Sequence, residues 1–242
     1  MRETSSAGDC PHCPVRELAV CGLAGSTDTR AIRRLWAEER HIRRRQMVYG
    51  EGNVIRELLT VFEGWAFRYK LLSDGRRQIV AFLLPGDPVV EPPIGPEGAN
   101  YSVEALTDLR LCVFDRDEFM KWAPSSPTAM TRLRHVCQLE FARNYETITN
   151  IGRRNALERV AFLILHLMGR LAERGRINGA TIMFPLRQRH LADALGLTVT
   201  HINRVLTELR ARNLIRLDQS RLTVVDAGGL ARLAGNAAMA AG

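Results

Sequence analysis

Long hydrophobic runs are missing from this sequence. No stretch approaches the roughly 18 consecutive apolar residues that a membrane-spanning helix requires. The first 14 residues are polar and interrupted by proline, so they also lack the apolar core of a secretory signal peptide. We therefore expect a cytoplasmic protein with no membrane partner.

Recognisable catalytic motifs are also missing. The sequence contains no Ser/His/Asp arrangement, no glycine-rich phosphate loop and no paired acidic site placed by a motif. A catalytic protein on a regulatory fold is a competing hypothesis, and these absences argue against it. We predict that the chain is not an enzyme and has no catalytic residues.

Positive charge, by contrast, is in excess. The 34 Lys and Arg residues outnumber the 26 Asp and Glu residues, which gives a formal net charge of +8. A basic chain favours a polyanionic partner, nucleic acid before a membrane surface. The length of 242 residues suits two domains, and a hydrophobic content of 46% is enough to build their cores.

The cysteines are few and unevenly placed. Of the five, Cys10, Cys13 and Cys21 lie close together near the N-terminus, and Cys112 lies far along the chain. An odd count in a reducing compartment favours metal binding or redox chemistry over a disulfide framework. Three clustered thiolates with a remote fourth suit an iron–sulfur cluster. Zinc bound by the first three with His12 or Cys112, and a thiol–disulfide switch, are alternatives that the spacing leaves open.

The order of sequence patterns predicts an α+β fold in four parts. Residues 1–27 are rich in Gly, Pro and Cys, and we expect them to be irregular unless a ligand or partner orders them. Within the second part, residues 28–40 predict a helix with Ile32, Leu35 and Trp36 on one face. The four parts are a Cys-rich sensor segment (1–27), an antiparallel β-roll (28–120), a dimerisation helix (121–153) and a winged helix-turn-helix domain (154–242).

The β-roll is predicted from short runs rich in β-forming residues. Turn signals such as SDG at 73–75 and PGD at 85–87 separate these runs. Several short strands at this spacing indicate a small antiparallel barrel or roll. The runs span residues 58–64, 65–72, 77–84, 101–106 and 109–114.

Apolar residues recur three or four apart along the predicted dimerisation helix, close to a heptad pattern. Such a seam requires a partner helix, and one polar residue, here Asn144, can fix register and oligomeric state. Packing of the helix on its own β-roll is the alternative; we favour a homodimer. Cys137 is interpreted as a small buried hydrophobe and not as a metal ligand. The predicted interface residues are Met130, Leu133, Cys137, Phe141, Asn144, Ile148 and Ile151.

Residues 187–209, RQRHLADALGLTVTHINRVLTEL, have the steric features of a helix-turn-helix. Ala192 allows close approach of the two helices. Gly196 permits the left-handed backbone of a tight turn, and Thr198 can cap the second helix through its hydroxyl. Residues 215–225 contain two short β-segments about a polar turn, which predicts a wing.

One face of the second helix has the chemistry to read DNA. Arg204 suits bidentate donation to guanine, and Asn203 can pair with adenine. Thr200 and Thr207 lie on the same face, at the i, i+3, i+4, i+7 spacing that the four residues share. Phosphate contacts that position the motif are predicted for Arg187, Arg189, His190, Arg210 and Arg212.

The order of β-roll, long helix and winged helix-turn-helix, with LGLTVTHINRVLTELR at 195–210, resembles transcription regulators of the cAMP receptor protein/FNR superfamily. NALERVAFLILHLMGRLAERG at 155–175, LPGD at 84–87 and LRLCVF at 109–114 are similar to segments of its FNR/FixK-like (FnrN-type) branch. The resemblance covers nearly the whole chain. It implies a cyclic-nucleotide-binding-like roll, a homodimer on a palindromic site in double-stranded DNA, and RNA polymerase as a further partner.

The resemblance also implies a sensor. It assigns Cys10, Cys13, Cys21 and Cys112 as ligands of a [4Fe-4S] cluster that oxygen destroys. A regulator of the same family without a cluster, sensing through zinc, thiol–disulfide chemistry, heme or another small ligand, is the alternative. A metal-storage or redox module whose helix-turn-helix makes only protein contacts is a third hypothesis.

Three features depart from the family's usual pattern. The N-terminal spacing is C-x2-C-x7-C, which resembles a nitrogen-fixation-associated subgroup. Thr200 and Asn203 stand where the usual Glu and Ser would be, so we expect a half-site different from the familiar TTGAT type. The stretch at 86–106 lacks the Gly-Glu…Arg-Ser phosphate cassette, so we do not expect cAMP to bind.

Overall fold

The computed structural model of the 242-residue chain describes residues 13–24, 29–89 and 98–235. The chain forms two compact units. The first comprises residues 1–70 and 80–142, and the second comprises residues 71–79 and 143–242. The predicted Cys10 lies outside the described residues.

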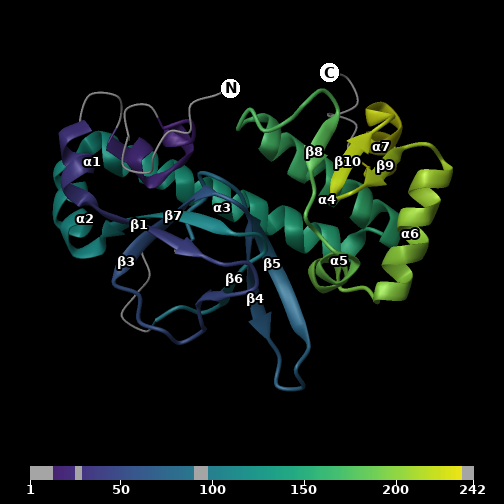
Figure 1. The fold of residues 1–242 in the computed structure, drawn as a ribbon, viewed down its shortest axis with the longest axis horizontal. Helices are drawn as coiled ribbons and strands as arrows, with labels where there is room; N and C mark the ends of the chain where they lie inside the picture. The colour runs from purple at the N-terminus through teal and green to yellow at the C-terminus, as the bar shows by residue number, and fades with distance from the viewer. Residues whose placement is uncertain (1–12, 25–28, 90–97, 236–242) are drawn as a thin grey trace. The chain divides into compact units, whose positions relative to one another are not determined.

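The first unit is built on two antiparallel sheets (Figure 1). In the three-stranded sheet, β7 lies between β1 and β3, and in the other sheet the order is β2-β6-β4-β5. Apolar side chains from both sheets, such as Val61, Val103 and Leu111, share one buried core. The strands are β1 (Trp36–Ile42), β2 (Met47–Tyr49), β3 (Glu57–Glu63), β4 (Ala66–Leu71), β5 (Arg77–Leu83), β6 (Ser102–Ala105) and β7 (Leu109–Asp115).

The helix predicted over residues 28–40 is wrong for its second half. Helix α1 (Thr29–Leu35) ends at Leu35, and Trp36 begins strand β1. Strand β1 pairs antiparallel with β7, Trp36 lying opposite Phe114, and this pairing satisfies backbone groups on one side of β7. Ladder formation with a distant strand therefore overrides the helical periodicity of the sequence.

The described part of the Cys-rich segment is regular, although its composition predicts an irregular chain. It forms two short 3-10 helices, η2 (Arg16–Leu18) and η3 (Val20–Ala24). Val15 and Leu23 are buried in a core shared with α1, β3, β7 and helix α2 (Arg116–Trp122). Burial of apolar side chains, which favours folding by about 25 cal/mol per Å², is the physical reason for this order.

The long helix is α3 (Pro127–Arg153), and no described helix is long and apolar enough to cross a membrane. The region predicted as one helix over 121–153 begins instead with the end of α2 and the 3-10 helix η4 (Ala123–Ser125). Pro127 then occupies the first position of α3, where its missing N–H costs no hydrogen bond.

The second unit packs helices around a small sheet whose strand order is β8-β10-β9 (Figure 1). A capping box begins the first helix of this unit: Asn155 caps α4, and Glu158 accepts from the Asn155 backbone N–H. Ile164, Leu191, Ile202 and Leu222 are buried in the unit. Its elements are α4 (Ala156–Ala172), β8 (Thr181–Met183), α5 (Gln188–Leu195), α6 (Val199–Ala211), β9 (Ile215–Asp218), β10 (Arg221–Val224) and α7 (Ala227–Leu233).

Candidate functional site

Helices α5 and α6 form the predicted helix-turn-helix. Helix α5 ends at Leu195, and Gly196 has a left-handed backbone with φ of 64°. The Thr198 hydroxyl accepts from the backbone N–H of His201, with an N–O distance of 3.2 Å, and so caps α6. The roles predicted for Gly196 and Thr198 are therefore confirmed, and both follow from local backbone chemistry.

The four residues predicted to read bases lie together on the solvent face of α6. Its other face buries Ile202, Val205, Leu206 and Leu209, which fixes the rotation of the helix. A 3.6-residue period then leaves the positions between them outside. Thr200, Asn203, Arg204 and Thr207 are all exposed.

These four side chains differ in their present partners. The Asn203 Oδ1 accepts from Gln188 Nε2 at 3.1 Å, and the Thr207 hydroxyl accepts from Arg210 at 3.2 Å. Arg204 makes no hydrogen bond or ion pair within the part of the chain that the structure describes. Its five N–H donors are therefore available to a base edge or a phosphate.

Two of the predicted phosphate-binding residues next to α5 suit that role, and one does not. Arg187 and Arg189 are exposed. His190 is only 2% exposed, and its Nδ1 accepts from the Arg187 backbone N–H at 3.0 Å. Its ring therefore satisfies a donor at the start of α5, and its burial corrects the prediction that it contacts phosphate.

Arginines extend the basic surface beyond α5. Arg210 and Arg212 are exposed, and Arg212 forms an ion pair with Glu208 one turn back. In the predicted wing, β9 and β10 are joined through Gln219 and Ser220, both with positive φ. Two exposed arginines of the wing, Arg216 and Arg221, were not predicted from the sequence. The alternation of apolar and polar residues along β9 and β10 is the signal that marks them as exposed.

Three of the four predicted cluster ligands are described, and they belong to one core. Cys21 and Cys112 are 2% and 5% exposed within the same hydrophobic cluster, and the partly buried Cys13 packs against it. Cys112 lies on the central strand β7, opposite Glu39 of β1 and Thr60 of β3. The Cys13 carbonyl accepts from the Arg16 backbone N–H at 3.2 Å, so Cys13 lies in the turn that leads into η2.

The three described cysteines of the predicted set supply soft thiolate donors, which suit iron–sulfur clusters and zinc alike. Among the residues described, no three His, Cys, Asp or Glu side chains are arranged to hold a metal ion, and Cys10 and His12 lie outside those residues. An apolar surrounding limits solvent access to such a cluster, as this core would.

The same core also touches the long helix. Leu133 and Val136 of α3 pack against the cluster of residues that contains Cys21 and Cys112. Arg132 of α3 donates to the Gly22 carbonyl and forms an ion pair with Glu17 at 3.1 Å. The cysteine-bearing turns and α3 are therefore joined by polar and apolar contacts.

The predicted dimer seam on α3 is only partly open. Phe141 and Ile148 are 60% and 67% exposed, and Met130 is 38% exposed. Asn144 is exposed, and Cys137 is half-buried. Leu133 instead packs into its own unit, which corrects its assignment to the seam.

The end of the predicted seam and one residue outside it differ from the pattern. Ile151 is half-buried and comes within 4.0 Å of the position a Cβ on Gly196 would take. Tyr145, 66% exposed, is an apolar residue of α3 that the pattern missed.

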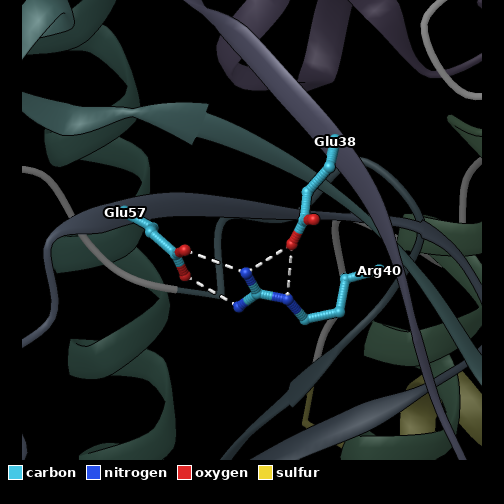
Figure 2. Close-up of polar contacts among 3 residues, drawn as sticks. All are labelled: Glu38, Arg40 and Glu57. Carbon is cyan, nitrogen blue, oxygen red and sulfur yellow. Dashed lines mark hydrogen bonds and ion pairs between the residues drawn. The ribbon is translucent and has the colours of Figure 1, made fainter.

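A charge network lies on the β-roll (Figure 2). The Arg40 guanidinium lies between two carboxylates, donating to Glu57 at 2.7 and 2.8 Å and to Glu38 at 2.5 and 3.0 Å. The hydrogen bond from Arg40 holds the pKa of Glu57 below its ordinary value, and Glu57 in turn raises the pKa of Arg40. Both line an open groove of about 450 Å³. With two carboxylates already bound, Arg40 is poorly placed to receive an anionic ligand.

A buried arginine tethers the roll to α3. Arg68 of β4 is 3% exposed, and it donates to Glu140 of α3 at 3.0 Å and to the Pro88 carbonyl at 2.6 Å. Sequence reasoning missed this pair because its members are far apart in the chain. A buried charge requires such a partner, so Glu140 helps to determine where α3 lies on the roll.

Comparisons with known proteins agree with this geometry. Residues 158–233 match the model of the Crp-like helix-turn-helix domain, and residues 39–125 match that of the cyclic nucleotide-binding domain. The chain is 32% identical to the transcriptional activatory protein AadR of Rhodopseudomonas palustris, over 89% of this chain and 88% of that protein.

Two further relatives are similar over most of the chain. It is 30% identical to the nitrogen fixation regulation protein FixK of Bradyrhizobium diazoefficiens, over 93% of each chain. The solved structure of FixK2 from Bradyrhizobium japonicum superposes with a TM-score of 0.74 at 29% identity, covering 81% of this chain and 96% of that one.

Proposed function

Because this chain belongs to the Crp/FNR family of DNA-binding transcription regulators, we propose that it is a homodimeric, oxygen- or redox-responsive member of that family. The input would be a [4Fe-4S] cluster held by Cys10, Cys13, Cys21 and Cys112. The output would be binding of two α6 helices to a palindromic promoter site, with RNA polymerase as a further partner. One observation supports this assignment above others: Cys21, Cys112 and Leu133 of α3 share one core.

The residues of the chain supply a route from sensor to helix. When bound, the cluster would link the cysteine thiolates to one another. The family resemblance implies that oxygen destroys this link. Cys13 precedes η2, Cys21 lies in η3 and Cys112 lies on β7, and all three belong to one core or pack against it. Arg132 and Leu133 then connect those turns to α3. Loss of this link would loosen the η2–η3 turns and remove their contacts with Arg132 and Leu133 of α3.

The open part of α3 supports the dimer. Phe141, Tyr145 and Ile148 expose apolar surface along one stretch of the helix, and exposed apolar patches mark interaction sites. A second copy of α3 would cover them in a two-fold arrangement. Two-fold symmetry requires half-sites about one helical turn of DNA apart.

The test is a gel-shift on a palindromic promoter fragment over a range of salt concentrations, with the protein purified anaerobically and then exposed to air. We expect specific, salt-dependent binding that air abolishes. Cys112→Ser should lose the air response and its iron, whereas Cys137→Ser, at a cysteine outside the ligand set, should keep both. Air-insensitive specific binding would exclude the redox proposal but retain the regulator, and a zinc-only protein would favour the zinc alternative.

A further inference from the structure

We propose that Gln188 positions the carboxamide of Asn203 and thereby decides which base edges Asn203 can read. The inference rests on the proposed recognition of DNA by α6. It concerns a residue outside that helix, at the first position of α5, that sequence reasoning did not assign to the interface. Gln188 is half-buried, and Asn203 is exposed.

The contact has a direction. Gln188 Nε2 donates to Asn203 Oδ1 at 3.1 Å, so the carbonyl side of the Asn203 carboxamide is turned toward α5. A carboxamide has its acceptor oxygen and its NH2 donors at opposite edges of one planar group. Turning Oδ1 toward Gln188 therefore leaves the Nδ2 donors as the group directed away from the pair.

This direction changes the predicted base preference. Pairing with adenine uses both sides of the amide, because Oδ1 accepts from N6 while Nδ2 donates to N7. Gln188 occupies one of the two lone pairs of Oδ1 and turns that oxygen toward α5, so Asn203 presents its Nδ2 donors to a base edge. Donors match guanine O6 and N7 and thymine O4, whereas adenine offers only N7 beside its N6 donor. We infer that Asn203 selects guanine or thymine at its base pair, in place of the adenine that the sequence predicts.

The neighbouring Arg204 provides an internal reference. Arg204 makes no contact with the pair among the described residues, so its own base pair should not depend on Gln188. Gln188 would act as a positioning residue through Asn203. Its effect should therefore appear at one base position and leave the folding of the motif unchanged.

The test is selection of bound half-sites from a randomised pool, followed by competition assays with single-base variants. Asn203→Ala identifies the base position, because the preference there should disappear. Gln188→Glu should then invert that preference. A carboxylate can only accept, so Asn203 must turn Nδ2 toward it and direct Oδ1 outward, to the donors of adenine N6 or cytosine N4.

We expect a shift of about tenfold, at that position alone, from guanine or thymine toward adenine or cytosine. Gln188→Ala should release the amide and raise the relative affinity for adenine. The added charge of Gln188→Glu should weaken binding to all sequences alike. The ratio of the affinities for different bases at that position can therefore still be measured. Thermal unfolding and the Arg204 position should be unchanged in both variants.

Two failures are distinguishable. If the wild-type protein selects no sequence at all, the proposed DNA recognition fails. If the wild type is specific but Gln188→Glu and Gln188→Ala retain its base preferences at every position, the role of Gln188 is refuted.

Discussion

The helix-turn-helix and the cysteine-bearing core differ in how their parts are brought together. In the helix-turn-helix, the reading face comes from one continuous stretch, and a glycine turn and a threonine cap determine its geometry. In the cysteine-bearing core, two 3-10 turns, strand β7 and helix α3 meet only because the sheets and α1 hold them together. The first region depends on local backbone chemistry, and the second depends on tertiary packing. A mutation in one region should therefore leave the local structure of the other region intact.

The largest effect is expected at the tether between the roll and α3. Glu140→Leu leaves the buried Arg68 without its carboxylate, and loss of one partner of a buried pair costs about 3 kcal/mol or more. Hydrogen exchange should report this loss in the β-roll and leave α5 and α6 as protected as before. Lys121→Ala, at an exposed pair in the same unit, should leave the free energy of unfolding nearly unchanged. Equal loosening of α5 and α6 would contradict the independence of the two regions.

A second variant breaks the cysteine-bearing core alone. A Cβ at Gly22 would lie 2.5 Å from the Arg16 carbonyl oxygen, so Gly22→Ala should displace the η2–η3 turns at a cost of about 2 kcal/mol. Iron content after anaerobic purification should fall, and the full chain should lose specific binding as it does in air while weak, salt-dependent non-specific binding persists. Gly152→Ala is the matched control, because nothing lies within 4 Å of its Cβ position. Full iron retention in Gly22→Ala would mean that the turns do not hold the ligands.

A third variant breaks the reading face alone. Arg204→Ala removes an exposed guanidinium suited to guanine, which should cost about 1–3 kcal/mol of discrimination at one base position. Competition between specific and non-specific DNA measures this, and weak non-specific binding should persist. Iron content should match the wild type. An equal loss of affinity for all sequences would identify Arg204 as a phosphate contact instead.

The smallest effect concerns pH and the charge network of the roll. Because the pKa of Glu57 is lowered in the folded state, its contribution is present above the ordinary carboxyl pKa and is lost as the pH falls through the lowered value. Both side chains of the Arg40–Glu57 pair are over a third exposed, so we expect less than about 1 kcal/mol. Denaturant unfolding should show Glu57→Gln less stable than the wild type at neutral pH, with the difference vanishing in acid. If the two proteins still differed in stability in acid, the difference would not arise from the ionised Glu57 carboxylate.

The contrast between the regions also explains what could be predicted from the sequence. Gly196 and Thr198 act within a few residues, and the structure confirms their predicted roles. The end of α1 at Leu35 could not be predicted, because only pairing with β7 makes Trp36 a strand residue. Likewise, the burial of His190 depends on the packing around α5, and its polar chemistry gave no sign of it.

The seam and the tether show the same limit. Heptad spacing placed Leu133 and Phe141 on one stripe, but only the core beneath α3 decides that Leu133 packs partly buried against it and that Phe141 is exposed. The Arg68–Glu140 pair joins residues of different elements, and no local pattern marks either one. The Gln188–Asn203 contact is likewise a product of the angle between two helices.

The most direct test is to measure iron, acid-labile sulfide and zinc in the full chain purified under strictly anaerobic conditions. We expect about four irons and four sulfides per chain, lost on exposure to air and absent from Cys112→Ser. A protein that contains zinc and no iron, or one whose iron is unaffected by Cys112→Ser, would contradict the assignment of these four cysteines as the ligands of the sensor.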